Sequence, residues 1–176
     1  MYSMSRLFPC AVVAVVLLVG AAAVAEVANS YAGRVILFDA RPPSQWANDA
    51  VFHRFVNQHS VRSVGADDDG SWEIEYMAFF RRVVGDREVS VRFYDSMESA
   101  DRYIAAYTLY LGDPQQRIVG GRAELAPPEF RPNRYYSIAV VSRGQTLARH
   151  DRFALVGDEP ERSGEVVFTD DEARGQ

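Results

Sequence analysis

The residues best suited to catalysis lie next to one another near the end of the chain, in His150-Asp151-Arg152. A histidine beside an aspartate could act as the base of a Ser-His-Asp triad, whose members assemble from distant parts of a chain. No serine lies in a sequence context typical of a nucleophile. The chain has no Gly-x-Ser-x-Gly motif, no His-Glu-x-x-His motif and no glycine-rich phosphate loop. We therefore predict no catalytic residues and no enzymatic activity, and we keep a small hydrolase centred on His150 as an alternative.

The remaining histidines and the densest acidic cluster do not have the spacing of metal ligands. His53 and His59 are six residues apart, which separates them by about 120° around a helix, unlike the i, i+4 histidines that share a metal ion. Asp67-Asp68-Asp69-Gly70, followed by Glu73 and Glu75, lacks the alternating aspartates of a calcium-binding loop. The pattern predicts a solvated turn, no metal site and no cofactor. If calcium did bind there, it would raise the melting temperature.

Several tyrosines could form a binding surface. Strict alternation places Tyr103 and Tyr107 on one face of a strand with Leu109, which predicts that both face the core. The same alternation exposes a second set, and exposed aromatic rings can anchor protein interfaces or stack on sugars. Isolated surface aromatics are also ordinary in globular proteins. The predicted surface set is Tyr94, Tyr110 and Tyr135.

The first 25 residues have the organisation of a bacterial secretory signal. Arg6 supplies a positive charge, an uncharged apolar run follows, and Ala23-Val24-Ala25 offers the small residues that a signal peptidase recognises. We predict cleavage after Ala25 and a periplasmic or secreted protein with no membrane span after cleavage. The alternative is that the run is kept as an anchor, since it is just long enough to span a bilayer. Cys10 is the only cysteine, so the cleaved chain could form no disulfide.

Composition and charge exclude several classes of function. The chain of 176 residues is 48% hydrophobic and 24% charged, the mix expected for a globular domain. All 19 basic residues are arginine, which excludes lysine chemistry such as a Schiff base. The formal net charge is −5, and residues 158–176 hold seven acidic residues against two arginines. We predict an acidic, flexible tail at 158–176 and no nucleic-acid partner, because the body of the chain carries no excess of positive charge.

The elements that must position these residues are mostly strands. Residues 48–61 form the one helical candidate, with Phe52, Phe55, Val56 and His59 on one face. Residues 72–80 and 89–94 alternate with period two and are interpreted as a hairpin. In the last strand, alternation would point Arg149 and Asp151 into the core, so we predict a bulge or break there. The seven predicted strands cover residues 34–38, 72–80, 89–94, 103–111, 118–125, 136–140 and 146–156.

One stretch resembles a known family of domains. The pattern Phe130-x-Pro132-x-x-x-Tyr136-x-Ile138-x-Val140 resembles the tyrosine-corner segment of fibronectin type III and related immunoglobulin-like domains. The resemblance covers residues 130–156, and Arg134 and the helical segment depart from the family pattern. It implies that the Tyr136 hydroxyl bonds back to upstream backbone and that Trp72 is the core tryptophan.

These observations predict a mainly β protein. We expect an antiparallel immunoglobulin-like sandwich of about seven strands over residues 26–157, with one helix inserted near 48–61. With an export signal and no recognisable catalytic set, the expected function is protein–protein contact at the bacterial cell envelope, with an envelope protein as the partner. The alternatives are a carbohydrate- or peptidoglycan-binding module and a small periplasmic hydrolase.

Overall fold

The computed structural model describes residues 24–97 and 100–158. The predicted signal segment, apart from its last two residues, and the predicted acidic tail, apart from Asp158, lie outside the described residues. Helix α1 (Val24–Ser30) spans the bond after Ala25 at which we expect cleavage. Neither helix of the described residues has the length and apolar character that a membrane crossing requires.

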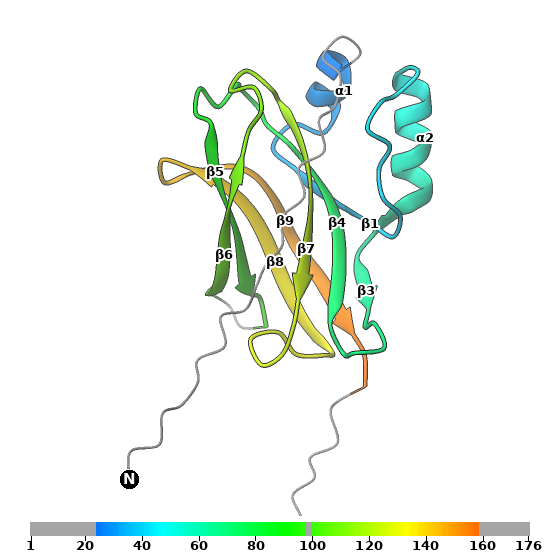
Figure 1. Ribbon diagram of the computed structural model, residues 1–176, viewed down its shortest axis with the longest axis vertical. Helices are drawn as coiled ribbons and strands as arrows, with labels where there is room; N and C mark the ends of the chain where they lie inside the picture. The colour runs from blue at the N-terminus through cyan, green and yellow to red at the C-terminus, as the bar shows by residue number, and fades with distance from the viewer. Residues whose placement is uncertain (1–23, 98–99, 159–176) are drawn as a thin grey trace, which may run out of the picture.

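Two β-sheets pack face to face and form the body of the molecule (Figure 1). The first has the order β2-β1-β4-β7, and the second has the order β3-β9-β8-β5-β6. The prediction of a mainly β protein with a helix near 48–61 is confirmed. The described residues contain nine strands rather than about seven, because residues 60–61 and 63–65 form two short strands whose side-chain spacing gave no signal. The strands are β1 (Val35–Phe38), β2 (Ser60–Val61), β3 (Ser63–Gly65), β4 (Trp72–Phe79), β5 (Glu88–Asp95), β6 (Arg102–Tyr110), β7 (Ile118–Leu125), β8 (Arg134–Ser142) and β9 (Gln145–Val156).

The predicted hairpin between residues 72–80 and 89–94 is wrong. Strand β4 pairs with β1 and β7, whereas β5 pairs with β6 and β8 in the other sheet. Residues 80–87 connect the two strands, and a connection of this length is not held to the tight turn that joins hairpin partners. It crosses from one sheet to the other. One pairing is parallel rather than antiparallel, because β3 runs alongside the end of β9.

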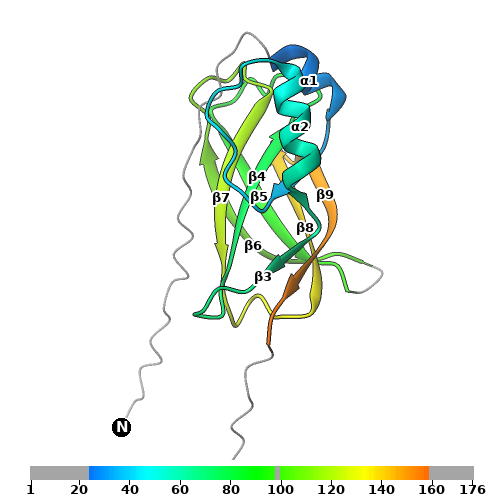
Figure 2. The ribbon, with the colours of Figure 1, turned by 90° about the vertical axis from the view of Figure 1, so that its right-hand side faces the viewer.

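The four-stranded sheet is covered on both faces. Trp72, Ile74 and Tyr76 of β4 face the core between the sheets, as alternation predicts. Met77 and Phe79, on the opposite face of β4, pack under the helices in a second, smaller core. Figures 1 and 2 show α1 and α2 (Asp49–His59) together beside this sheet, at one end of the sandwich. This double burial explains why the second half of β4, residues 76–79, is apolar on both faces, whereas Glu73 in its first half is exposed.

Helix α2 begins directly after Asn48, as predicted, but it ends at His59, two residues before the predicted end, because Ser60–Val61 pair with β1 as strand β2. The Asn48 side chain accepts a hydrogen bond from the backbone N–H of Val51 at 3.0 Å, which satisfies one of the free donors of the first turn. Phe52 and Val56 are buried against the second core. His59 is the last residue of the helix, and its ring lies 4.6 Å from that of Phe55.

Trp72 and Tyr136 are both buried in the main core. The Trp72 indole Nε1–H donates to the carbonyl oxygen of Val156 at 3.0 Å, tying β4 to the end of β9. The Tyr136 hydroxyl contacts the backbone of Arg131, five residues upstream, through both the N–H and the carbonyl group. This is the hydrogen bond to upstream backbone that the resemblance implies.

The pairing of β8 with β9 contains the predicted bulge. Tyr136 lies opposite Phe153 and Ile138 lies opposite His150, so β9 has one residue more than β8 over this stretch. The extra residue removes the conflict in the alternation. Phe153 stays in the core, while Asp151 and Arg152 are exposed.

Candidate binding surface

Three tyrosines from three strands lie on the outer face of the five-stranded sheet. Tyr94 comes from β5, Tyr103 from β6 and Tyr135 from β8. Tyr103 is 57% exposed and Tyr135 is 41% exposed, whereas Tyr94 is half-buried. We call this surface, together with Met97, Arg149 and Arg152, the tyrosine face. It contains two of the three predicted surface tyrosines.

Tyr94 and Tyr103 form one ring pair of the tyrosine face. They lie opposite each other in the β5–β6 register, with ring centroids 6.1 Å apart and ring planes at 75°. The prediction that Tyr103 faces the core is wrong. The register shifts between Phe93 and Tyr94, which places Ile104 as an extra residue in β6 and turns Tyr103 outward. Tyr107, beyond the shift, is largely buried as predicted.

Arg149 fixes the ring pair to the last strand. Its guanidinium lies 5.8 Å from the centre of the Tyr94 ring and makes ion pairs with Asp101 and with Asp151. Its Nη2 also donates to the Ser137 hydroxyl at 3.2 Å. Burial raises the pKa of Asp101, but hydrogen bonds from Ser96 and Arg149 outweigh this and hold it below its usual range. Arg149 is therefore a fixed part of the surface.

Arg152 and Met97 surround Tyr135. The Arg152 guanidinium lies 3.9 Å from the centre of the Tyr135 ring, a close cation–π contact that leaves the positive charge available. Met97 is 46% exposed, and its sulfur accepts a hydrogen bond from the Tyr135 backbone N–H at 3.4 Å. An aromatic ring, a thioether and a guanidinium thus share one exposed patch.

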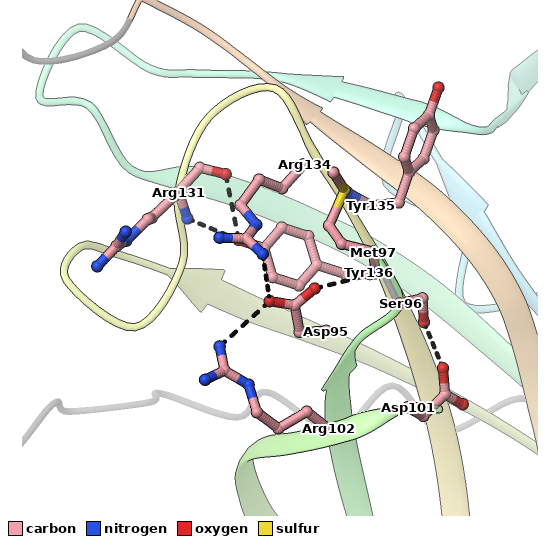
Figure 3. A network of polar contacts seen from close by, with 9 residues as sticks. All are labelled: Asp95, Ser96, Met97, Asp101, Arg102, Arg131, Arg134, Tyr135 and Tyr136. Atoms are coloured by element: carbon pink, nitrogen blue, oxygen red, sulfur yellow. Dashed lines mark hydrogen bonds and ion pairs between the residues drawn. The ribbon is translucent and has the colours of Figure 1, made fainter. Parts of the chain in front are cut away.

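A buried carboxylate holds the end of β5 under this patch (Figure 3). Asp95 is 6% exposed, and one of its carboxylate oxygens forms an ion pair with Arg134 Nη2 at 2.9 Å and accepts a hydrogen bond from Arg102 Nη2 at 3.2 Å. Its other oxygen accepts from the backbone N–H of Met97 at 3.0 Å, so the network places Met97 beside Tyr135. Sequence reasoning missed these three side chains. The sequence signal that was available is that Asp95 continues the alternate positions of Val89, Val91 and Phe93, which form the apolar face of β5.

Tyr110 lies apart from the tyrosine face. It is 62% exposed and pairs with Glu88 at the far end of β5 and β6. Seven residues separate it from Tyr103 along β6, roughly 23 Å at the usual rise of a strand. The third predicted surface residue is exposed but does not join the other two.

The histidines make separate structural contacts. His150 Nδ1 lies 3.0 Å from the Val35 carbonyl oxygen and Nε2 lies 3.2 Å from the Arg152 carbonyl oxygen. Both nitrogens thus face backbone rather than the serine or carboxylate of a triad. His53 bonds to the Tyr31 hydroxyl, and His59 bonds to Asp39.

The acidic residues 67–69 form a turn. The Gly70 N–H donates to the Asp67 carbonyl oxygen at 2.9 Å. The Asp69 carboxylate accepts from the backbone N–H and the hydroxyl of Ser71, and the hydroxyl hydrogen bond lowers the Asp69 pKa most. Within residues 24–97 and 100–158, no group of three histidine, cysteine or acidic side chains is placed to hold a metal ion.

No family model matches the chain, and no curated protein matches its sequence.

Proposed function

We propose that this chain is an exported immunoglobulin-like domain that works without catalysis, by binding an envelope protein through its tyrosine face. The observation that carries the proposal is the exposed cluster of Tyr103, Tyr135, Met97 and Arg152, supported from below by the Asp95 network. Export rests on the signal-like organisation of residues 1–25.

The strand order supports an immunoglobulin-like sandwich. In that fold, strands A, B and E share one sheet and strands C, F and G share the other. Here β1, β4 and β7 occupy the first set of positions, and β5, β8 and β9 occupy the second. Strand β6 adds to the edge of β5, as an extra strand does in variable-type domains. Tyr136 then lies near the start of strand F, where the tyrosine corner belongs.

The composition of the tyrosine face favours a protein partner. Tyrosine, methionine and arginine are enriched at the centres of protein interfaces, and tyrosine gives a large contact area for little loss of side-chain entropy. The faces of Tyr94 and Tyr135 are partly engaged by arginine guanidinium groups. This arrangement is less suited to stacking a sugar than an open ring is. Carbohydrate binding stays the second candidate, and the highly exposed Tyr110 is the residue that favours it.

Site-specific photo-crosslinking in the native host tests the proposal. A photoreactive amino acid replaces Tyr103 or Tyr135 in two separate full-length chains, and it replaces the exposed Gln58 of α2 in the control chain. We expect one envelope protein to be crosslinked from both face positions and not from Gln58.

The crosslinked protein is then purified and titrated against the chain and two variants. Tyr103→Ala should weaken its binding about tenfold or more, as truncation of an interface anchor does, whereas Tyr110→Ala should not. Equal crosslinking from Gln58, or equal loss with Tyr110→Ala, would contradict the assignment of the tyrosine face. Retention on purified peptidoglycan that is abolished by Tyr110→Ala would favour the carbohydrate-binding alternative instead.

A further inference from the structure

A polar groove lies between β1 and β9, on the side of the sandwich where the two sheets meet. Its volume is about 880 Å³, within the range of small-molecule sites. One wall is the turn from α1 into β1, together with the end of α2, and the other wall is the 146–152 stretch of β9. His150 links the walls, because its Nδ1 contacts the Val35 carbonyl oxygen across the groove.

Arginines dominate the charge of this groove. Its lining contains five arginines, one histidine and a single acidic residue, Asp151. Asp151 is already paired with Arg149, and Arg149 is also paired with Asp101. The other four guanidinium groups have no carboxylate within ion-pair distance in the part of the chain that the structure describes. They belong to Arg34, Arg62, Arg81 and Arg152. A chain of net charge −5 thus gathers, in the lining of one groove, four arginines that form no ion pair within the described residues, of which Arg152 also stacks on the Tyr135 ring.

Backbone contacts with β9 hold two of these arginines at different points along that strand. Arg34 forms a bridge with Arg149, where the Arg149 N–H donates to the Gly33 carbonyl oxygen at 3.0 Å. Arg62 lies between β2 and β3, and its carbonyl oxygen accepts from the Ala154 N–H at 2.8 Å. The fold therefore fixes the backbone positions from which both side chains extend.

Gly33 makes room for a third arginine. Its φ of +83° is in the region that favours glycine, and a Cβ added there would lie 2.5 Å from Arg81 Nε. The Arg81 side chain thus packs directly on the turn that leads into β1. With any other residue at position 33, Arg81 would have to leave this place.

From this placement we propose that the groove is a binding site for a ligand that carries two or more phosphate groups. The guanidinium fork matches phosphate oxygens in a bidentate way. The five arginines come from four separate segments: Arg34 from the α1–β1 turn, Arg62 from the β2–β3 connection, Arg81 from the β4–β5 connection, and Arg149 and Arg152 from β9. A tetrahedral phosphate presents acceptor oxygens in several directions, whereas a carboxylate presents two in one plane. The groove shares Arg149 and Arg152 with the tyrosine face, but this proposal does not require a protein partner there.

Calorimetric titration of the full-length chain with tripolyphosphate tests this site. We expect saturable binding that weakens about tenfold with Arg34→Gln or with Arg62→Gln, and further with both, because each substitution removes a charge-assisted contact. Arg54→Gln and Arg87→Gln are the matched controls, since both arginines are exposed and lie outside the groove. The controls should bind as tightly as the unchanged chain.

A second arm distinguishes a soluble phosphate compound from a lipid headgroup. Vesicles of neutral phosphatidylcholine are compared with vesicles that also contain an anionic phospholipid. Binding only to the anionic vesicles, lost with the double variant, assigns the site to headgroup phosphate. Tripolyphosphate binding lost with the same variant assigns it to a soluble ligand. The proposal is overturned if neither probe binds, if the control variants lose as much, or if citrate binds as tightly as tripolyphosphate.

Discussion

The Tyr136 hydroxyl both accepts and donates a hydrogen bond with the backbone of one residue, Arg131. It accepts from the Arg131 backbone N–H at 2.7 Å and donates to the Arg131 carbonyl oxygen at 3.2 Å. The tyrosine therefore pins the β7–β8 connection to the core, where its ring packs against Phe130 and Phe153.

We expect Tyr136→Phe to lower the free energy of unfolding by about 1–3 kcal/mol, because both backbone groups lose their partner while the ring packing is kept. Urea denaturation measures the change, with Tyr110→Phe as the control on an exposed tyrosine. A loss no larger than that of the control would show that water replaces the hydroxyl without cost.

Stability should fall steeply at alkaline pH. The hydroxyls of Tyr76 and Tyr107 hydrogen-bond to each other between the two sheets, and burial raises the pKa of both above the ordinary value of 10.0. The folded state then holds protons that the unfolded chain releases. The stabilisation is complete below pH 10 and is lost as the pH rises further, by up to about 1.4 kcal/mol per pH unit for each tyrosine.

Urea denaturation at a series of pH values from 8 to 11 checks this dependence. The double variant Tyr76→Phe/Tyr107→Phe should show a shallower decline above about pH 10 than the unchanged chain, because its two rings cannot ionise. Equal declines in both chains would assign the alkaline loss to other groups.

Local elements of this fold could be predicted, whereas the pairing of its strands could not. The apolar face of α2 and the alternation in β4 follow directly from side-chain spacing, and both are confirmed. A period of two fixes which side chains share a face but not which strand lies alongside. The sheet to which β5 belongs therefore could not be predicted.

The candidate surface could be predicted only in part, because alternation predicts which way a side chain faces only where the strand has no extra residue. Tyr135 is exposed as alternation predicts, but the orientation of Tyr103 depends on one extra residue in β6. The bulge in β9 could be predicted because charged residues would otherwise enter the core. No charged residue would enter the core if β6 had no bulge, because Ile104 and Tyr103 are both compatible with a buried or an exposed position, so the sequence gives no sign of this bulge. The arginine-lined groove joins residues as distant in sequence as Arg34 and Arg152, and no local pattern reveals it.

Gly121 should not tolerate a side chain. It lies opposite Tyr76 in the β4–β7 register, and an added Cβ would lie 2.3 Å from the Tyr76 hydroxyl oxygen. Gly121→Ala should therefore lower the free energy of unfolding by about 1–3 kcal/mol, the usual cost of overpacking a core. Gly65→Ala is the matched control, because nothing lies within 4 Å of a Cβ at that strand position. Thermal or urea unfolding of the pair would measure the difference, and equal stabilities would show that the Tyr76 ring can move aside.

Asp95 should contribute far more to stability than Arg102, one of the two arginines with which it forms an ion pair. The Asp95 side chain is 7% exposed and that of Arg134 is 31% exposed, whereas that of Arg102 is 76% exposed. Asp95→Ala leaves the Arg134 guanidinium without its counter-charge and should cost about 3 kcal/mol or more. Arg102→Ala removes only a solvent-screened ion pair and should cost less than about 1 kcal/mol.

Denaturation of the two variants side by side measures this contrast. A double variant, Asp95→Ala/Arg134→Ala, should regain part of the loss, because it removes the unpaired cation together with its partner. Similar losses for Asp95→Ala and Arg102→Ala would show instead that water reaches the carboxylate and screens both ion pairs. Asp95→Ala should also weaken binding of any protein that contacts the tyrosine face. The reason is that the Asp95 carboxylate holds the Met97 backbone N–H at 3.0 Å and so positions the methionine beside Tyr135.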